Sequence, residues 1–410
     1  MLTVGEFTWL QLLGLYWPVL AVSFVVAVIA TPIARKVAHA TGVVDHPDES
    51  RKIHRKPIAY LGGVAVLVAV LAGIATSSAL ISKSPLAFQP VPTAIILGML
   101  AIAFTGFADD ALGWDPWLKT AGQLVAAAAL AIEDVGTKVA AGFCNGVFGT
   151  RDIVFPIPGT DFNFDVVYWL GTAVIAIFVL GGCNAANLID GLDGLLSGIV
   201  AITAAAFLVL GLMLAMSLTP DVVDRLREAM PVDAFGDQGG DGVTLDGVRI
   251  MLPLAVLGAS LGFLIYNFNQ ASIFLGDTGS LLFGYLCVVM ILMLGERGHT
   301  HYVVAGLIIF AVPIMDTALA IIRRKIAGKP MSEPDSNHIH HILKRKLGTV
   351  KKTVLSLYLL SAAFAVLGIF VARLHLTGGV GAWLIYFVAA VLFGGVGFIA
   401  VRSARRHGEA

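Results

Sequence analysis

The sequence has 410 residues, of which 58% are hydrophobic and 13% charged, a composition outside the range of soluble globular domains and within that of polytopic membrane proteins. The 27 Lys and Arg residues balance the 27 Asp and Glu residues, so the charge gives no indication of nucleic acid as a partner. Three scattered cysteines exclude a disulfide framework.

Long apolar runs predict an all-α polytopic membrane protein. About 20 apolar residues in a helix cross the hydrocarbon core of a bilayer, where every backbone polar group must bond within the helix. About eleven transmembrane helices are expected, the fourth of them short, and together they form a single integral-membrane domain over residues 1–410. They cover residues 10–34, 61–82, 92–108, 117–133, 166–183, 195–217, 249–266, 280–295, 302–322, 353–373 and 380–401.

The basic residues predict how the chain is oriented. Nineteen of the 27 Lys and Arg residues fall in one set of alternate loops and eight in the other. The positive-inside rule places the richer set in the cytoplasm, so the N-terminus is expected outside and the C-terminus inside. The acidic loop of residues 218–248 then lies outside, and residues 151–167 are expected to form a small hairpin there about a Pro-Gly turn.

Carboxylates gather at the cytoplasmic ends of the predicted helices. "GFADDALGWDPWLK" places Asp109 and Asp110 at the end of the third span and Lys119 at the start of the fourth, and "FLGDTGS" places Asp277 at a similar junction. Converging carboxylates repel one another unless a cation lies among them, and oxygen ligands with substrate phosphates suit Mg²⁺. A divalent ion is therefore implied, although a solvated turn also explains the Asp pair.

The segment "NAANLIDGLDGL" joins the fifth and sixth spans and repeats polar residues at every third position. This spacing gives a compact polar stripe on a helix or a tighter helical turn. Helix capping is the competing interpretation, since Asn and Asp are favoured at caps. The stripe consists of Asn184, Asn187, Asp190 and Asp193, with Gly191 and Gly194 following the two aspartates.

Histidines cluster in "DSNHIHHILKRKLG". Arranged as a helix, this segment is amphipathic and would lie on the membrane surface, with His338, His341 and Arg345 on one face. Next to a carboxylate and Mg²⁺ centre such groups would bind phosphate oxygens. Zinc ligands and solvated loop residues are the alternatives for His338, His340 and His341.

Asp316 and the basic segment before the second span can each be interpreted in two ways. Asp316 stands inside the ninth span after Pro313, beside an expected kink, and suits either a structural hydrogen bond or a substrate contact. In "RKIHRKPIAYLGGVAV", Arg55 suits either membrane anchoring or substrate binding. The glycine pair that follows suits an anion-facing helix terminus or close packing.

Taken in this order, "HRKPIAYLGG", "GFADD", "NAANLIDGLDGL", "FLGDTGS", "PIMD" and "DSNHIHH" resemble the bacterial polyprenyl-phosphate N-acetylhexosamine-1-phosphate transferases of glycosyltransferase family 4 type. The undecaprenyl-phosphate N-acetylglucosaminyl-1-phosphate transferase branch is the most similar, and nearly the whole chain is covered. Ala59 stands where a second proline is usual and Ser336 where a basic residue is common. These departures affect contacts to sugar or phosphate rather than the reaction class.

The resemblance implies an enzyme that transfers N-acetylhexosamine 1-phosphate, by default N-acetylglucosamine 1-phosphate, from a UDP-sugar to undecaprenyl phosphate and releases UMP. It implies Mg²⁺, with Mn²⁺ as the alternative ion, and a place in the inner membrane with the active site on the cytoplasmic face. The product would initiate a cell-envelope polysaccharide such as the O-antigen of lipopolysaccharide. A homodimer is also consistent with the resemblance.

The resemblance also assigns roles to individual residues. Asp109, Asp110 and Asp277 would be catalytic, with Asp277 and Asn187 at the metal. Phe274 would stack on uracil, and the three histidines would hold the diphosphate. The expected substrate-binding residues are Asn187, Asp190, Asp193, Asn267, Phe274, His338, His340, His341, Lys119 and Arg55.

Several alternatives stay open at this stage. Direct attack by the lipid phosphate is favoured, because a phosphate monoester has its second pKa near 6 and needs positioning more than a base, while a covalent aspartyl-phosphate is the other route. Phospho-N-acetylmuramoyl-pentapeptide transfer is the related activity. From another class, an ion-coupled transporter would place polar residues near the middle of the membrane and show paired repeats.

Overall fold

The computed structural model describes residues 3–4, 7–45, 57–80, 91–150, 153–156, 158–159, 163–217, 247–328 and 338–408. Arg55, Ser336 and nearly all of the acidic loop lie outside these residues. The expected contact of Arg55 with substrate therefore stays a prediction.

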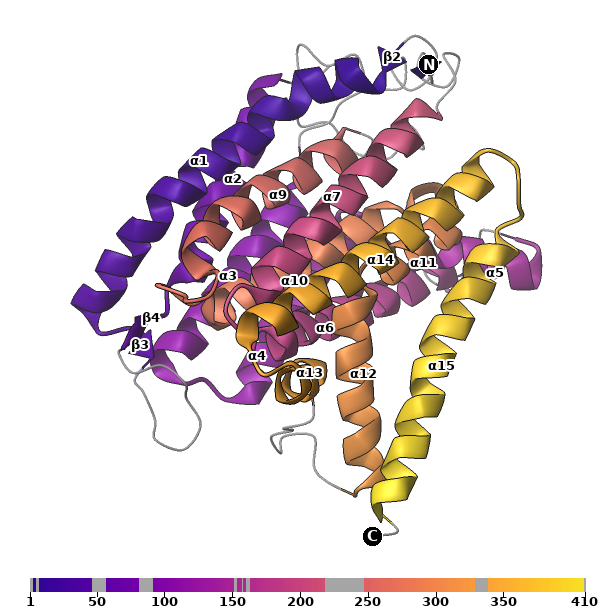
Figure 1. Ribbon diagram of the computed structural model, residues 1–410. Helices are drawn as coiled ribbons and strands as arrows, with labels where there is room; N and C mark the ends of the chain where they lie inside the picture. Colours follow the sequence, from indigo (N-terminus) through magenta and orange to yellow (C-terminus); the bar gives the residue numbers. More distant parts are fainter. Residues whose placement is uncertain are drawn as a thin grey trace.

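Helices long and apolar enough to cross a membrane dominate the described chain (Figure 1). Eight single helices meet this description. A bent pair, α11 (Thr300–Ile309) and α12 (Ala311–Ile326), makes a ninth if it counts as one span. The protein is therefore an all-α, multi-pass membrane protein, as predicted. The eight are α1 (Trp9–Thr41), α2 (Gly62–Leu80), α3 (Thr93–Leu112), α6 (Val166–Ile189), α7 (Leu195–Met216), α9 (Val248–Asn267), α10 (Gly276–Met293) and α14 (Val350–Leu376).

The remaining two predicted spans are also helices, α4 (Pro116–Ile132) and α15 (Trp383–Gly408). Of the eleven predicted segments, the ninth departs from expectation because its two halves, α11 and α12, meet at an angle of 81°. Pro313, the third residue of α12, has no N–H and cannot bond to the carbonyl of Ile309, which suits a position near a helix start. The expected kink is thus a complete break.

Short elements complete the described structure. They include the expected hairpin, in which β5 (Val154–Pro156) pairs antiparallel with β6 (Asn163–Asp165). The other strand pairs are β1 (Thr3–Val4) with β2 (Phe7–Thr8), and β3 (Val44–Asp45) with β4 (Ile58–Ala59). The short helices are α5 (Val139–Phe148), the 3₁₀ helix η2 (Glu296–Gly298) and α13 (Ile339–Leu347).

Helix α10 is the centre of the bundle. Its residues are apolar on all sides and nearly all buried, and it contacts α2, α3 and α6. Glycines let its neighbours approach closely: a side chain on Gly106 of α3 would overlap the backbone of Thr278, and one on Gly63 of α2 would overlap that of Gly279. Both contacts lie at the N-terminal turn of α10, where the polar residues are.

The segment before α2 is bonded to the segment before α10. The Phe274 N–H donates to the Ala59 carbonyl at 2.8 Å, and the N–H groups of Gly62 and Gly63 donate to the carbonyls of Phe274 and Leu275 at 3.0 and 2.8 Å. Because those two N–H groups are used in this way, the glycine pair serves close packing and not anion binding.

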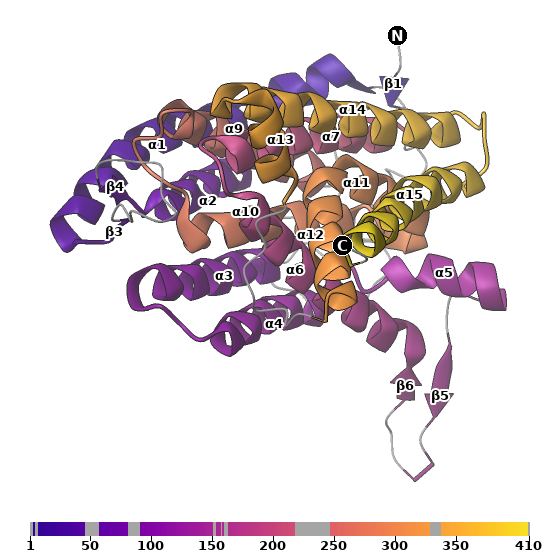
Figure 2. The same ribbon diagram turned by 60° about the horizontal axis from the view of Figure 1, so that its bottom comes forward.

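The two ends of the chain lie at opposite ends of the bundle (Figure 1). The C-terminus, β3, β4 and α13 lie toward the lower end of that view, and the N-terminus lies toward the upper end. Seen from the lower end, α13 lies close to α14 and α12 projects beneath it (Figure 2).

Candidate active site

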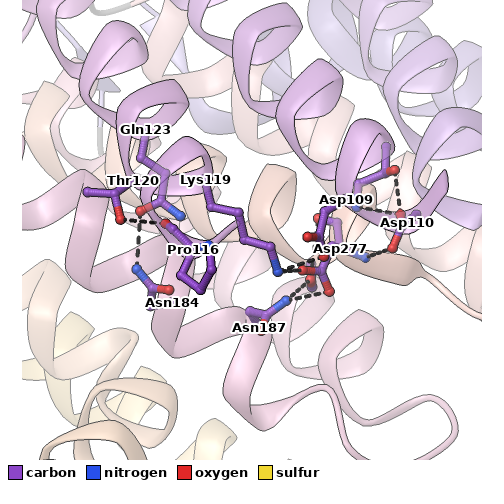
Figure 3. Close-up of polar contacts among 11 residues, drawn as sticks. Asp109, Asp110, Pro116, Lys119, Thr120, Gln123, Asn184, Asn187 and Asp277 are labelled. Carbon is purple, nitrogen blue, oxygen red and sulfur yellow. Dashed lines mark hydrogen bonds and ion pairs between the residues drawn. The ribbon is translucent and has the colours of Figure 1, made fainter. Parts of the chain in front are cut away.

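Three helices bring two carboxylates to one lysine (Figure 3). The Nζ atom of Lys119, in the second turn of α4, lies 2.6 Å from an oxygen of Asp109 near the end of α3 and 2.5 Å from an oxygen of Asp277 in the first turn of α10. The side chains of Lys119, Asp109 and Asp277 are 28%, 17% and 19% exposed, so the group is half-buried but open to solvent. One ammonium thus bridges two carboxylates and can neutralise only one of their two negative charges.

Asp110 has a different environment from its neighbour Asp109. One oxygen accepts the backbone N–H of Asp277 at 2.8 Å, and the other accepts the N–H and the hydroxyl of Thr278 at 2.9 and 2.7 Å. These bonds cap the N-terminus of α10 from another helix. Gly276 makes room for the cap: its φ is +71°, and a Cβ there would lie 2.6 Å from Asp110 Oδ2. Asp110 therefore holds Asp277 in place.

The predicted polar stripe divides between two partners. Asn187 donates its amide nitrogen to Asp277 Oδ1 at 2.9 Å and to the Ser280 hydroxyl at 3.0 Å. Asn184, one turn earlier, donates to Gln123 of α4 at 3.1 Å, away from the carboxylate pair (Figure 3). Only the later part of the stripe belongs to the site.

The turn after α6 carries Asp190 and Asp193. Asp193 accepts the side-chain amide of Asn269 at 3.1 Å and the N–H of Ala271 at 3.0 Å, which joins this turn to the loop before α10. Asp190 is partly exposed, and none of the hydrogen bonds found in the described chain involves its carboxyl group. Burial, and then the charges of Asp277 and Asp110, raise the pKa of Asp190 to about 8. Asp190 is thus open to a ligand.

Asn267, an expected substrate contact, is 4% exposed, and both the oxygen and the nitrogen of its side chain are hydrogen-bonded within the protein. Its oxygen accepts the Gly194 N–H at 3.1 Å and the Ser197 hydroxyl at 2.9 Å, and its nitrogen donates to the Ile273 carbonyl at 3.0 Å. In this arrangement Asn267 fastens the start of α7 to the loop before α10, and a contact with substrate would require one of these bonds to open.

Two aromatic rings border the carboxylates. Phe274 is partly exposed, and its ring packs edge-on against Tyr60 with centroids 6.2 Å apart. Burial and the charges of Asp110, Asp277 and Asp190 raise the pKa of Tyr60 far above its ordinary value, so its phenol stays protonated. Sequence reasoning missed Tyr60, although it lies within the quoted "HRKPIAYLGG" segment.

The histidine segment forms the predicted helix, α13. His338 precedes it, and Asp316 of α12 bonds to His338 Nδ1 at 2.9 Å and to the Ile339 N–H at 2.8 Å. Asp316 therefore makes hydrogen bonds that fit its structural interpretation, and these bonds are equally compatible with a role toward substrate. The adjoining histidines approach the turn after α6, because a Cβ on Gly191 would collide with the His340 ring.

Burial is the main factor that lowers the pKa of His340, to about 4, and that of His341. The His340 ring is 2% exposed, and neither of its nitrogens has a hydrogen-bond partner in the described chain. At neutral pH His340 is therefore an uncharged imidazole stacked on His338, with ring centroids 5.7 Å apart.

These side chains fit a shared Mg²⁺ better than a closed metal site. Within the described residues, no three His, Cys, Asp or Glu side chains are grouped to hold an ion. Mg²⁺, however, is commonly held by one or two carboxylates together with substrate phosphates and water. Asp277 and Asp109, which already share a cation in Lys119, provide that set. Asn187 presents its amide nitrogen to Asp277, so as a metal ligand it would have to turn its oxygen inward.

The described helices form a bundle suited to a membrane, with a cluster of carboxylates at the ends of α3 and α10. The chain belongs to glycosyl transferase family 4, which matches residues 92–295. The matched stretch contains Asp109, Asp110, Lys119, Asn187 and Asp277. The family expected from the sequence motifs is thereby confirmed.

Relatives that match over most of their length agree with this membership. The chain is 31% identical over 372 residues to the probable undecaprenyl-phosphate N-acetylglucosaminyl 1-phosphate transferase of Bacillus subtilis, covering 90% of this chain and 87% of the relative. It is 32% identical over 361 residues to the decaprenyl-phosphate N-acetylglucosaminephosphotransferase of Mycolicibacterium smegmatis (82% and 77% covered). It is 28% identical over 368 residues to the phospho-N-acetylmuramoyl-pentapeptide-transferase of Shouchella clausii (86% and 96% covered).

Proposed function

We propose that this protein transfers N-acetylhexosamine 1-phosphate, with N-acetylglucosamine as the sugar, from a UDP-sugar to undecaprenyl phosphate in the cytoplasmic membrane. The observation that carries the proposal is the pair of carboxylates, Asp109 and Asp277, held by Lys119 at the ends of three packed helices. The relatives at 31% and 32% identity are named for transfer of N-acetylglucosamine phosphate to undecaprenyl and decaprenyl phosphate, which supports this sugar and a polyprenyl phosphate acceptor.

The reaction forms one bond and breaks one. An oxygen of the lipid phosphate attacks the phosphorus that carries the sugar, the bond between the two phosphates breaks, and UMP leaves. At neutral pH the attacking monoester is largely a dianion, because its second pKa is near 6. Positioning and charge neutralisation therefore matter more than a base. The covalent aspartyl-phosphate route through Asp109 is the alternative.

Each side chain has a role in this proposal. Lys119 contacts a phosphate oxygen, Asp109 orients Lys119 and the lipid phosphate, and Asp110 fixes the turn that carries Asp277. When bound at Asp277, with Asn187 nearby, Mg²⁺ would neutralise the diphosphate and the departing UMP. Mn²⁺ is the alternative ion.

The remaining side chains of the site concern the nucleotide and the diphosphate. Phe274 offers a partly exposed face on which uracil could stack, and Tyr60 supports that ring from its edge. Asp190, whose carboxyl group has no hydrogen bond within the part of the chain that the structure describes, contacts the nucleotide, and Asp193 holds the loop before α10 through the Ala271 N–H. The histidines around α13 contact the diphosphate. We place the site on the cytoplasmic face, where UDP-sugars are made and where the basic loops are predicted.

Phospho-N-acetylmuramoyl-pentapeptide transfer is the second candidate, because a relative with that name aligns over 96% of its length. The two candidate activities differ in the UDP-linked donor, so the donor that the protein accepts decides between them. A transporter is disfavoured by membership of a glycosyl transferase family. In the cell the product would initiate a surface polysaccharide, and a homodimer is the expected assembly.

The test is release of radiolabelled UMP by the purified protein with undecaprenyl phosphate, Mg²⁺ and a panel of donors that includes UDP-N-acetylglucosamine, UDP-N-acetylgalactosamine and UDP-N-acetylmuramoyl-pentapeptide. Release with the first donor that requires both lipid and Mg²⁺ supports the proposal. Release with the pentapeptide donor alone selects the second candidate, and no release with any donor refutes both.

The metal assignment needs a variant with a matched control. Asp277→Asn is expected to lose Mg²⁺-dependent turnover while still inserting into the membrane. Asp115→Asn is the control, because Asp115 is an exposed N-cap of α4 for which Asn is an equivalent residue. Normal turnover by the Asp277 variant would remove this residue from the metal site.

A further inference from the structure

A buried aspartate lies behind the histidine segment. Asp316 is completely buried and His338 is 5% exposed. The carboxyl oxygen Oδ2 lies 2.9 Å from His338 Nδ1, and Oδ1 accepts the N–H of Ile339 at 2.8 Å. Both oxygens of Asp316, in α12, therefore contact the residues at the start of α13.

This arrangement determines which ring nitrogen of His338 is available. An ionised carboxylate only accepts hydrogen bonds, so its contact requires a proton on Nδ1. In the described chain, the Asp316 contact is the only hydrogen bond of the His338 ring, and Nε2 has no protein partner. The second nitrogen is thus left for a ligand.

The ring itself is held on two sides. It stacks nearly parallel to His340, with planes 8° apart, and His340 in turn packs against Gly191 in the turn that carries Asp190. A histidine whose second nitrogen is bonded to a carboxylate has its tautomer and orientation set by that bond. Asp316, His338 and the turn after α6 therefore form one connected unit.

We propose that Asp316 is a positioning residue for the transfer reaction: it fixes the proton of His338 on Nδ1 and presents Nε2 to a phosphate oxygen of the substrate. The inference rests on the proposed function for the identity of that ligand. When Nε2 donates to phosphate the ring is an imidazolium, and the Asp316 carboxylate balances its charge. Asp316 itself touches neither substrate.

A purely structural role is the competing explanation, because the Ile339 N–H bond alone would anchor α13 to α12. The two explanations differ in how Asp316 and His338 depend on each other. A positioning residue acts only through the histidine, so its removal has no further effect once His338 has gone. An anchor acts on the whole of α13, so its effect adds to that of the histidine.

The experiment compares Asp316→Asn, His338→Gln and the double variant, with Thr317→Val as the matched control. Thr317 is the next residue of α12, buried, with a hydroxyl that has no partner in the described chain. We expect Asp316→Asn to lower kcat about 10- to 100-fold with little change in KM for the UDP-sugar. The double variant should be no slower than His338→Gln, and Thr317→Val should match the wild type.

A second measurement does not depend on turnover. In protein labelled with ¹⁵N-histidine, the signals that disappear in His338→Gln belong to His338 and report which nitrogen carries the proton. A proton on Nδ1 in the wild type that is lost in Asp316→Asn supports the inference, and an unchanged ring overturns it. The inference is also overturned if the rate loss of the double variant equals the product of the losses of Asp316→Asn and His338→Gln. If the wild type transfers no sugar phosphate, the proposed function fails, and the ¹⁵N signals still decide the role of Asp316.

Discussion

Replacing Lys119 with methionine tests the arrangement at the centre of the site. The change removes one charge and keeps a side chain of similar length. The two carboxylate oxygens that contact Nζ at 2.6 and 2.5 Å can be no more than about 5 Å apart. Without the ammonium, Asp109 and Asp277 would face each other within this distance and no positive charge would lie between them.

The size of the effect follows from that separation. Two unit charges about 5 Å apart repel by about 3 kcal/mol at an effective dielectric constant of about 20. A substrate with negatively charged phosphates meets this uncompensated charge as it enters the site. Since about 1.4 kcal/mol corresponds to a tenfold change in rate, we expect kcat/KM for the UDP-sugar to fall about 100-fold.

The assay is UMP release by purified Lys119→Met, at several concentrations of UDP-sugar and Mg²⁺, beside Lys119→Arg. Arginine keeps the positive charge and is expected to retain most of the activity that methionine loses. Thermal unfolding in detergent checks that both variants are folded. If folded Lys119→Met works within threefold of the wild type, the lysine-bridged carboxylate pair is not part of the catalytic arrangement.

Three other changes test single contacts. Asp110→Asn should destabilise the protein by about 1–3 kcal/mol and slow turnover, because the cap on α10 loses acceptors; thermal unfolding and UMP release would measure both, and a normal rate would contradict the positioning role. Gly191→Ala should lower activity by displacing His340, whereas Gly181→Ala, which meets open space, should have no effect on the same assay. His340, with its pKa lowered to about 4, takes up a proton less readily than the unfolded chain, so its contribution to stability is complete above about pH 6.5 and is lost as the pH falls toward 4. Melting temperatures between pH 4.5 and 7.5 should therefore fall less steeply on acidification in His340→Gln than in the wild type, and parallel curves would contradict this origin.

The helical bundle could be predicted because hydrophobic length is a local property of the sequence. Ten of the eleven apolar runs are single helices, the ninth is the bent pair α11 and α12, and the hairpin about Pro158 and Gly159 is present as expected. The break between α11 and α12 was predicted only as a kink, since Pro313 shows where a helix is weakened but not the angle at which its halves pack. That angle depends on the helices around it.

The candidate site was predictable as a set of residues and not as an arrangement. Asp109 and Asp110 are neighbours in sequence, yet one contacts Lys119 and the other caps α10, because consecutive helical residues point about 100° apart. Asn184 and Asn187 likewise reach different helices. Tyr60 gave no signal, since a single tyrosine beside a glycine pair has many ordinary explanations.

The sequence by itself determined the membrane setting, the helices and the polar residues at their ends, because hydropathy, spacing and motif order are properties of the linear chain. Only the tertiary structure decided which of those polar groups meet. Lys119 and Asp277 are separated by 158 positions, and Asp316 and His338 by 22 with a helix end between them. Hydrogen bonds act over about 3 Å, so these partners exist only where the packing of whole helices, set by contacts such as Gly106 against Thr278, brings their ends together.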